Sequence, residues 1–194
     1  DAQIVKKIEG EGYDGIPATN HDMKAVEYYI KKKLAGGSLK DVAEWVHFGL
    51  TSEDVNSIAY GMMLRSALQM VMIPALDEIA RTLLALAKEH AATPMLARTH
   101  GQSATPTTFG KEMRVFEARL TRQAKQLRSR VILVKFGGAT GNFNAHIAAL
   151  PDVDWRAFAQ KLIAHLNAGY KIALELNPTT TQIEPHDTYA ELFD

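Results

Sequence analysis

Cysteine is absent from this sequence of 194 residues, which excludes disulfide bonds, thiol nucleophiles and thiolate metal sites. Long hydrophobic runs are absent too. No run approaches the ~18 to 20 apolar residues that span a bilayer, and the first residues show no signal-peptide pattern. An excess of one charge is also lacking, because 22 Lys and Arg balance 22 Asp and Glu. We therefore expect a cytoplasmic protein with no membrane partner and, for the chain as a whole, no electrostatic basis for binding nucleic acid.

The pattern that is present most clearly is a helical apolar stripe that begins behind Thr51. Residues 51–54 fit a capping box, and apolar residues then recur at helical spacing as far as residue 87. Pro74 interrupts the stripe, and since the periodicity continues beyond it we expect a kink rather than an end. About 40 residues at ~1.5 Å each make a rod of roughly 60 Å, which is too long for a compact domain of this size.

The remaining segments predict helices and loops, and residues 1–48 show no convincing strand. A second long helix is expected from Thr105-Pro106, where a cap is followed by proline at the first helical position. Asn20 is the predicted N-cap of a helix that ends at Gly36. Shorter helical segments are expected at 1–9, 39–48, 154–168 and 187–194. The sequence therefore predicts an all-α fold whose long helices bury their apolar faces only with partners.

Positive charge is concentrated in one segment of the neutral chain. Residues 111–135 hold eight basic residues, which are opposed only by Glu112 and Glu117. One interpretation of such a segment is a helix that binds anionic polymers. In the more common one it is a solvated face or a contact between subunits.

Four polar clusters fall in loops or at helix ends, where binding groups gather. They are residues 19–22, 49–52, 98–102 and 179–182. Thr51 and Asn20 have a purely structural interpretation as helix caps, but the positive end of the helix dipole at Thr51 would also attract a carboxylate or phosphate. His21 and His100 are either hydrogen-bonded structural residues or proton-transfer groups, since histidine titrates near neutral pH.

Other chemistries find less support in the sequence. The seven histidines show no i,i+4 pair and no carboxylate–histidine helix signature, so we expect no metal site. Ser103 lies three residues after His100, but no strand–turn–helix elbow surrounds it. The glycines of residues 137–141 lack the lysine and the preceding strand of a phosphate-binding loop.

Three motifs together carry a resemblance to a known family. They are Leu50-Thr51-Ser52-Glu53-Asp54-Val55-Asn56, Arg98-Thr99-His100-Gly101-Gln102-Ser103-Ala104-Thr105-Pro106 and Thr181-Gln182-Ile183-Glu184-Pro185-His186-Asp187. Asn20-His21-Asp22 and Gly141-Asn142-Phe143-Asn144-Ala145-His146 add to it. In this order, and over nearly the whole chain, they resemble the adenylosuccinate lyase family of the fumarase/aspartase superfamily. Argininosuccinate lyase and fumarase share that architecture, but the His-Gly-Gln-x-Ala-Thr-Pro run favours the adenylosuccinate branch.

The resemblance implies a β-elimination that releases fumarate from adenylosuccinate, giving AMP, and from the succinyl carboxamide ribotide of purine synthesis. It implies no cofactor, a nucleotide substrate and a homotetramer whose active sites draw on three subunits, so that His100 and Thr51 are expected to serve different sites. By motif position, His100 is the acid that protonates the leaving nitrogen. The substrate-binding residues implied are Asn20, His21, Asp22, Thr51, Ser52 and Gln182.

The family's base is a serine in a Ser-Ser-x-Met-Pro-x-Lys-x-Asn-Pro loop, and these 194 residues contain no such run. The resemblance therefore implies an incomplete long-helix bundle, with 1–50 as part of a smaller helical first domain and 51–194 as the start of the bundle. We expect such a chain to be inactive alone. Two hypotheses from other classes stay open: a helical module that binds anions or nucleic acid through residues 111–135, and a non-catalytic protein whose rods assemble with a partner.

Overall fold

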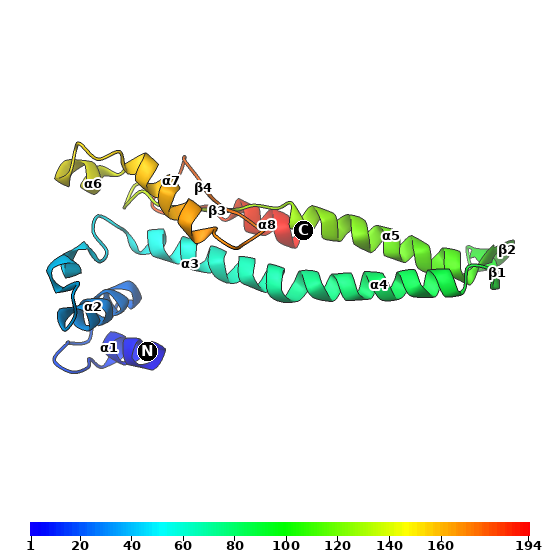
Figure 1. The fold of residues 1–194 in the computed structure, drawn as a ribbon, viewed down its shortest axis with the longest axis horizontal. Coiled ribbons are helices and arrows are strands. Elements are labelled where there is room, and N and C mark those ends of the chain that lie inside the picture. The colour runs from blue at the N-terminus through cyan, green and yellow to red at the C-terminus, as the bar shows by residue number, and fades with distance from the viewer. The chain divides into compact units, whose positions relative to one another are not determined.

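A computed structural model describes residues 1–194, which divide into two compact units. The first unit comprises Asp1–Ala59, Val134–Ile163 and Leu176–Pro185. The second comprises Tyr60–Leu133, Ala164–Glu175 and His186–Asp194. Helices dominate both units, as predicted for an all-α fold (Figure 1).

In the first unit, helix α1 (Ala2–Gly10) packs against helix α2 (Asp22–Ala35), and the 3-10 helix η1 (Lys40–Trp45) also contacts α2. The cap of α2 differs from the prediction. His21 is the N-cap, and its side chain accepts a hydrogen bond from the Lys24 amide. Asn20 instead adopts a left-handed conformation with φ of 49° and lies one residue too early to cap the helix. The histidine ring takes over the role because its Nδ1 acts as the acceptor that a cap needs.

The core of the first unit is aromatic. Helices α6 (Asn144–Ala149) and α7 (Trp155–Leu166) follow a glycine-rich loop. Phe143 and Trp155 are buried with Ala159, and partly buried side chains complete the cluster. These are Phe48, Phe136, Leu150 and Leu176. The predicted helix at 154–168 is thus present, and the Asp154 side chain accepts from the Ala157 amide at its start.

The long rod predicted from Thr51 consists of helix α3 (Ser52–Ala67), a π-helical turn η2 (Leu68–Met72) and helix α4 (Ile73–Glu89). Within η2 the Ile73 amide donates to the Leu68 carbonyl, one residue further back than in an α-helix. Proline has no N–H and its ring would collide with the carbonyl four residues earlier. The wider turn just before Pro74 accommodates this ring. The helix therefore continues past Pro74, as predicted, and the irregularity expected there is a π-helical turn.

A β-hairpin in the second unit was not predicted from the sequence. Strands β1 (Pro94–Thr99) and β2 (Gln102–Thr108) pair antiparallel. The predicted helix start at Thr105-Pro106 is wrong, because both residues belong to β2. Helix α5 (Phe109–Arg128) begins later, and the Thr108 side chain caps it by accepting from the Lys111 amide. The cap-then-proline pattern was misleading because Pro106 lies opposite Leu96 at the edge of a two-stranded ribbon, where a missing N–H is tolerated.

Helix α5 packs along α4 in the second unit (Figure 1). Gly110 permits this close approach, since a Cβ there would lie 2.4 Å from the Ala87 carbonyl oxygen. The strands β3 (Ile132–Val134) and β4 (Leu174–Leu176) form a second small ribbon, and the chain ends in helix α8 (Asp187–Phe193). None of the helices is long and apolar enough to cross a membrane.

Candidate active site

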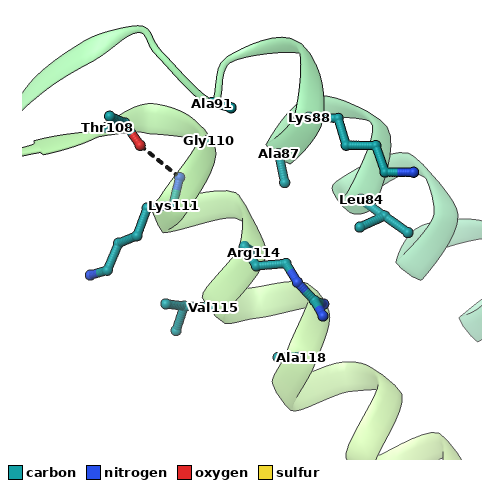
Figure 2. Close-up of a pocket in the computed structure, with 10 residues that line it drawn as sticks. All are labelled: Leu84, Ala87, Lys88, Ala91, Thr108, Gly110, Lys111, Arg114, Val115 and Ala118. Carbon is teal, nitrogen blue, oxygen red and sulfur yellow. Dashed lines mark hydrogen bonds between the residues drawn. The ribbon is translucent and has the colours of Figure 1, made fainter.

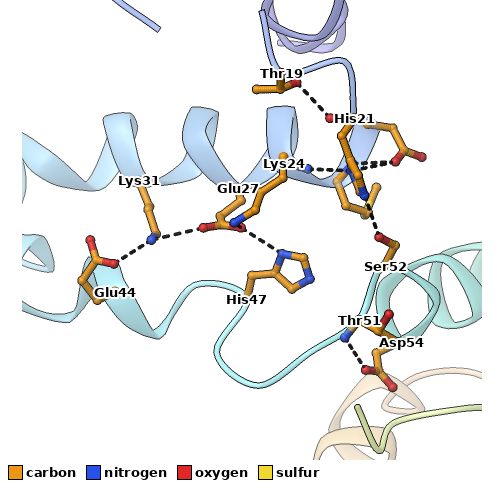
Figure 3. Close-up of polar contacts among 12 residues, drawn as sticks. Thr19, His21, Lys24, Glu27, Lys31, Glu44, His47, Thr51, Ser52 and Asp54 are labelled. Carbon is orange, nitrogen blue, oxygen red and sulfur yellow. Dashed lines mark hydrogen bonds and ion pairs between the residues drawn. The ribbon is translucent and has the colours of Figure 1, made fainter. Parts of the chain in front are cut away.

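Two of the predicted substrate-binding motifs meet in the first unit, at the N-terminal ends of α2 and α3 (Figure 3). The Nε2 atom of His21 lies 3.3 Å from the Ser52 hydroxyl. Because Nδ1 of His21 accepts from the Lys24 amide, the neutral ring carries its proton on Nε2 and donates it to Ser52. The helix cap therefore fixes the orientation of the His21 ring beside Ser52.

Thr51 and Ser52 stand at the start of α3, where the positive end of the helix dipole lies. The Thr51 amide donates to Oδ2 of Asp54 at 2.8 Å, which is one half of the predicted capping box. Both hydroxyl side chains are partly exposed. This turn therefore presents two hydroxyl groups and a positive dipole end, a combination suited to a carboxylate.

Asn20 and Asp22 flank His21 on the exposed side of the same turn. The Asp22 carboxylate accepts from the Met23 amide and lies 3.3 Å from Nδ1 of His21. Thr19 donates its hydroxyl proton to the His21 carbonyl. The Asn20-His21-Asp22 motif thus forms one exposed edge beside Ser52.

A buried carboxylate behind this edge was missed from the sequence. Glu27 is 6% exposed, and its carboxylate accepts hydrogen bonds from Lys24, Lys31 and His47 (Figure 3). The distance between Nδ1 of His47 and Oε2 of Glu27 is 3.0 Å. Burial raises the pKa of Glu27, but the hydrogen bonds from these three side chains outweigh it and hold the pKa at about 2. The i,i+3 and i,i+4 spacing of Lys24, Glu27 and Lys31 was visible in the sequence. The contact with His47, 20 residues away, was not.

A second buried carboxylate, Asp54, lies under the start of α3. The ammonium group of Lys135 is 2.7 Å from Oδ1 of Asp54, and both side chains are fully buried. The amides of Gly137 and Gly138 donate to the same carboxylate at 2.8 and 3.0 Å. Ser57 holds the backbone of Lys135 by accepting from its amide and donating to its carbonyl. The sequence suggested only a capping role for Asp54.

An aromatic cavity of about 430 Å³ also lies in the first unit, lined mainly by aromatic and aliphatic side chains. His146 lines it, is 1% exposed and packs 4.8 Å from the Trp155 ring, centre to centre. Burial lowers the pKa of His146, and the nearby Asp54 carboxylate and the Phe48 backbone offset this only in part. The ring is therefore neutral at pH 7 and serves as part of the core.

His100, the predicted acid, belongs to the second unit. It occupies the two-residue turn between β1 and β2, exposed to solvent, with φ of 52°, and Gly101 follows with φ of 76°. Two successive positive φ values define a type I′ turn, for which glycine is favoured at the second position and histidine is tolerated at the first. Gln182, the remaining predicted residue, is exposed in an irregular segment of the first unit.

The basic segment 111–135 contributes to a groove of about 610 Å³ in the second unit (Figure 2). Lys88, Lys111 and Arg114 line it together with apolar side chains of α4 and α5. Most of the positive charge of the segment is already paired. The ion pairs are Lys111–Glu112, Arg114–Glu117, Arg128–Asp77, Arg130–Glu191 and Lys135–Asp54.

Comparison with known protein families assigns this chain to a class of enzymes. A family model described as lyase matches residues 15–194, and the chain belongs to this family. Among curated proteins, it is similar to adenylosuccinate lyase of Legionella pneumophila (strain Corby), with 46% identity over 193 residues, and of Escherichia coli (strain K12), with 45% identity over 195 residues. These matches cover 99% and 100% of this chain but only 40% of each relative.

Solved structures support the fold. The 3-carboxy-cis,cis-muconate lactonizing enzyme of Pseudomonas putida aligns with a TM-score of 0.61 and 27% identity, over 90% of this chain and 36% of that one. A fumarate lyase of Mesorhizobium sp. BNC1 aligns with a TM-score of 0.65 and 23% identity, over 98% of this chain and 40% of that one. The predicted long-helix architecture of the fumarase/aspartase type is thereby confirmed.

Proposed function

We propose that these 194 residues are part of an adenylosuccinate lyase. The enzyme releases fumarate by β-elimination from adenylosuccinate, giving AMP, and from the succinyl carboxamide ribotide. The observation that carries the proposal is the meeting of His21 with Ser52 at the N-terminus of α3. It joins two motifs that the family resemblance assigns to binding of the same substrate. The similarity of this chain to curated adenylosuccinate lyases also extends over 99% of its length.

The proposed roles follow from the chemistry of each group. Thr51 and Ser52 bind a carboxylate of the succinyl group, which the positive end of the α3 dipole favours. The His21 ring, whose Nε2 lies 3.3 Å from the Ser52 hydroxyl, keeps Ser52 oriented. Asn20, Asp22 and Gln182 supply further polar contacts to the nucleotide.

His100 is the proposed general acid, since imidazole donates a proton efficiently near neutral pH. As a base removes the proton from the carbon, the C–N bond breaks and His100 protonates the departing nitrogen. Its exposed position on a tight turn allows it to enter a site formed with other chains. This suits a homotetramer in which His100 and Thr51 serve different active sites. No cofactor is required.

The base of the reaction is proposed to lie outside these residues, on the serine loop of the family. In this proposal residues 1–50 complete a small first domain and residues 51–194 begin the helix bundle. The polyanion-binding alternative is less well supported, because five of the eight basic residues in 111–135 are held in ion pairs. The expected partners are therefore a small nucleotide and further copies of the chain, in the cytoplasm.

The test compares the 194 residues alone with a full-length protein that contains them. Loss of adenylosuccinate absorbance is followed for both. Turnover is expected only for the longer protein, because an acid without its base forfeits a factor of ~10² to 10⁴ in rate. Turnover by the 194 residues at a rate typical of an intact lyase would show that the base lies within them. Absence of turnover in the longer protein would refute the proposed function.

A further inference from the structure

The buried carboxylate of Asp54 connects the Thr51–Ser52 turn, to which the proposed function assigns substrate binding, with the glycine-rich loop at residues 137–138. Its Oδ2 accepts from the Thr51 amide at the start of α3. Its Oδ1 accepts from the Lys135 ammonium and the Gly137 amide, and the Gly138 amide donates to both oxygens. The ammonium of Lys135 also donates to the Gly138 carbonyl at 2.7 Å. One carboxylate thus ties the Thr51–Ser52 turn to the loop at residues 137–138.

Burial makes this arrangement demanding. Asp54 and Lys135 are fully excluded from solvent, so each charge depends on the other and on the surrounding amides. The amides of Gly137 and Gly138 would lose their acceptor without the carboxylate. Because unsatisfied buried donors are costly, removing Asp54 is expected to shift the turn, the loop or both.

Charge gives the pair a second role. A lone carboxylate in the first turn of α3 would stand beside the hydroxyl groups of Thr51 and Ser52 and repel an incoming anion. The Lys135 ammonium lies 2.7 Å from Asp54 and cancels this negative charge. The positive end of the helix dipole then remains available to a substrate carboxylate.

We propose that Asp54 and Lys135 are positioning residues, which lock the Thr51–Ser52 turn against the 137–138 loop and keep the local charge balanced for an anionic substrate. This inference rests on the proposed lyase function for its effect on substrate, but the lock itself does not. Neither residue touches substrate. Their effect is on the placement of the groups that do.

The experiment uses a full-length protein that contains this chain and three variants. Asp54→Asn removes the charge and one acceptor oxygen while keeping the shape. Asp54→Asn combined with Lys135→Met removes both buried charges. Ser66→Ala is the control, because the Ser66 hydroxyl lies in the same helix and donates to the Met62 carbonyl of that helix.

Asp54→Asn is expected to raise KM for adenylosuccinate about tenfold, with a smaller change in kcat, since one misplaced hydrogen bond commonly has an effect of this size. Amide hydrogen exchange in peptides covering 50–55 and 136–141 should accelerate. The double variant should recover the melting temperature lost through the unpaired lysine, but not the KM. Ser66→Ala should leave KM within about twofold, as expected for a change that leaves Asp54, Lys135 and their partners in place.

Recovery of both KM and melting temperature in the double variant would overturn the proposal, because the pair would then be purely structural. Should the double variant fail to fold, Asp54→Glu decides, since it keeps the charge but displaces the oxygens. An unchanged KM in Asp54→Glu would reject positioning, and a raised KM with retained stability would support it. A wild-type protein without turnover would refute the lyase function, while the exchange measurement would still test the lock.

Discussion

The ionisation of Glu27 depends on two side chains of its own helix α2 and on His47 in the turn that follows η1. Lys24, Lys31 and His47 hold its pKa at about 2, against a reference value of 4.5. Because the unfolded chain binds this proton more tightly, the contribution to stability is complete above about pH 4.5 and is lost as the pH falls toward 2. The network therefore stabilises the first unit at neutral pH and weakens in acid.

Glu27→Gln is accordingly expected to lower the free energy of unfolding by about 2 kcal/mol at pH 7, since it replaces hydrogen bonds to a charged group. Urea titrations at pH 7 and pH 3 provide the measurement, and the difference from wild type should shrink at the lower pH. Glu44→Gln is the control, because Glu44 contacts the same Lys31 but its side chain is 88% exposed. An equal loss in both variants, or a loss independent of pH, would contradict the buried network as its source.

His100→Gln tests the proposed acid in a full-length protein. Glutamine keeps a hydrogen-bonding group but has no transferable proton, so turnover should fall ~10²-fold or more with little change in KM. Thr51→Ala should instead raise KM through lost carboxylate contacts. Steady-state kinetics at several pH values separate the two effects. A His100→Gln protein with a raised KM and intact turnover would make the histidine a binding residue, and His21 would become the better candidate for the acid.

Residue-scale prediction from the sequence worked where the signal was local. The start of α3 at Thr51-Ser52 and the motif at residues 20–22 were both placed beside helix ends, and the structure has them there. The ion pair between Asp54 and Lys135 joins residues 81 positions apart, and no periodicity or spacing marks it. The single-residue error at the α2 cap arose because asparagine is the commoner cap, whereas here the ring of His21 fulfils that role.

At the scale of elements, long amphipathic helices were predicted well and the short strands were not. The apolar stripe behind Thr51 extends over many turns, so tertiary contacts did not override it. The hairpin β1–β2 escaped detection because its turn is His100-Gly101 rather than the usual Asn-Gly or Asp-Gly. Its strands are also largely exposed, so no alternation of apolar and polar residues marks them.

Gly110 provides a test of how α4 and α5 pack. Helix propensity alone favours Gly110→Ala by ~1 kcal/mol. However, the added Cβ would meet the Ala87 carbonyl oxygen at 2.4 Å and the His90 carbonyl oxygen at 2.6 Å. We expect Gly110→Ala to destabilise by roughly 1 to 3 kcal/mol, as overpacking does.

Gly10→Ala is the matched control for Gly110→Ala, since Gly10 lies in helix α1, where an added Cβ would meet no atom of a neighbouring segment within 4 Å. This control should be neutral or slightly stabilising. Thermal unfolding monitored by circular dichroism compares both variants with wild type. A Gly110→Ala protein as stable as Gly10→Ala would mean that α4 and α5 separate easily at this point.

For the molecule as a whole, the decisive property is how much apolar surface its long helices leave in solvent. Met63, Met70 and Val71 are 66%, 70% and 68% exposed, and Met72 and Ile79 are about half exposed. A monomeric protein rarely leaves so many large apolar side chains exposed to solvent along neighbouring helical turns. The short elements of this chain do not cover them, so we expect copies of the chain to associate through α3, η2 and α4.

Sedimentation velocity over a range of concentrations tests this self-association. The 194 residues should sediment as an oligomer, and Met70→Lys should weaken association about tenfold or more, because burying a methionine side chain contributes ~1.5 to 3 kcal/mol. Thr82→Lys is the control, since it adds the same charge at an exposed position without removing an apolar group. A stable monomer at high concentration would contradict the expected assembly. Equal weakening by both lysines would indicate charge repulsion rather than the loss of an apolar contact at Met70.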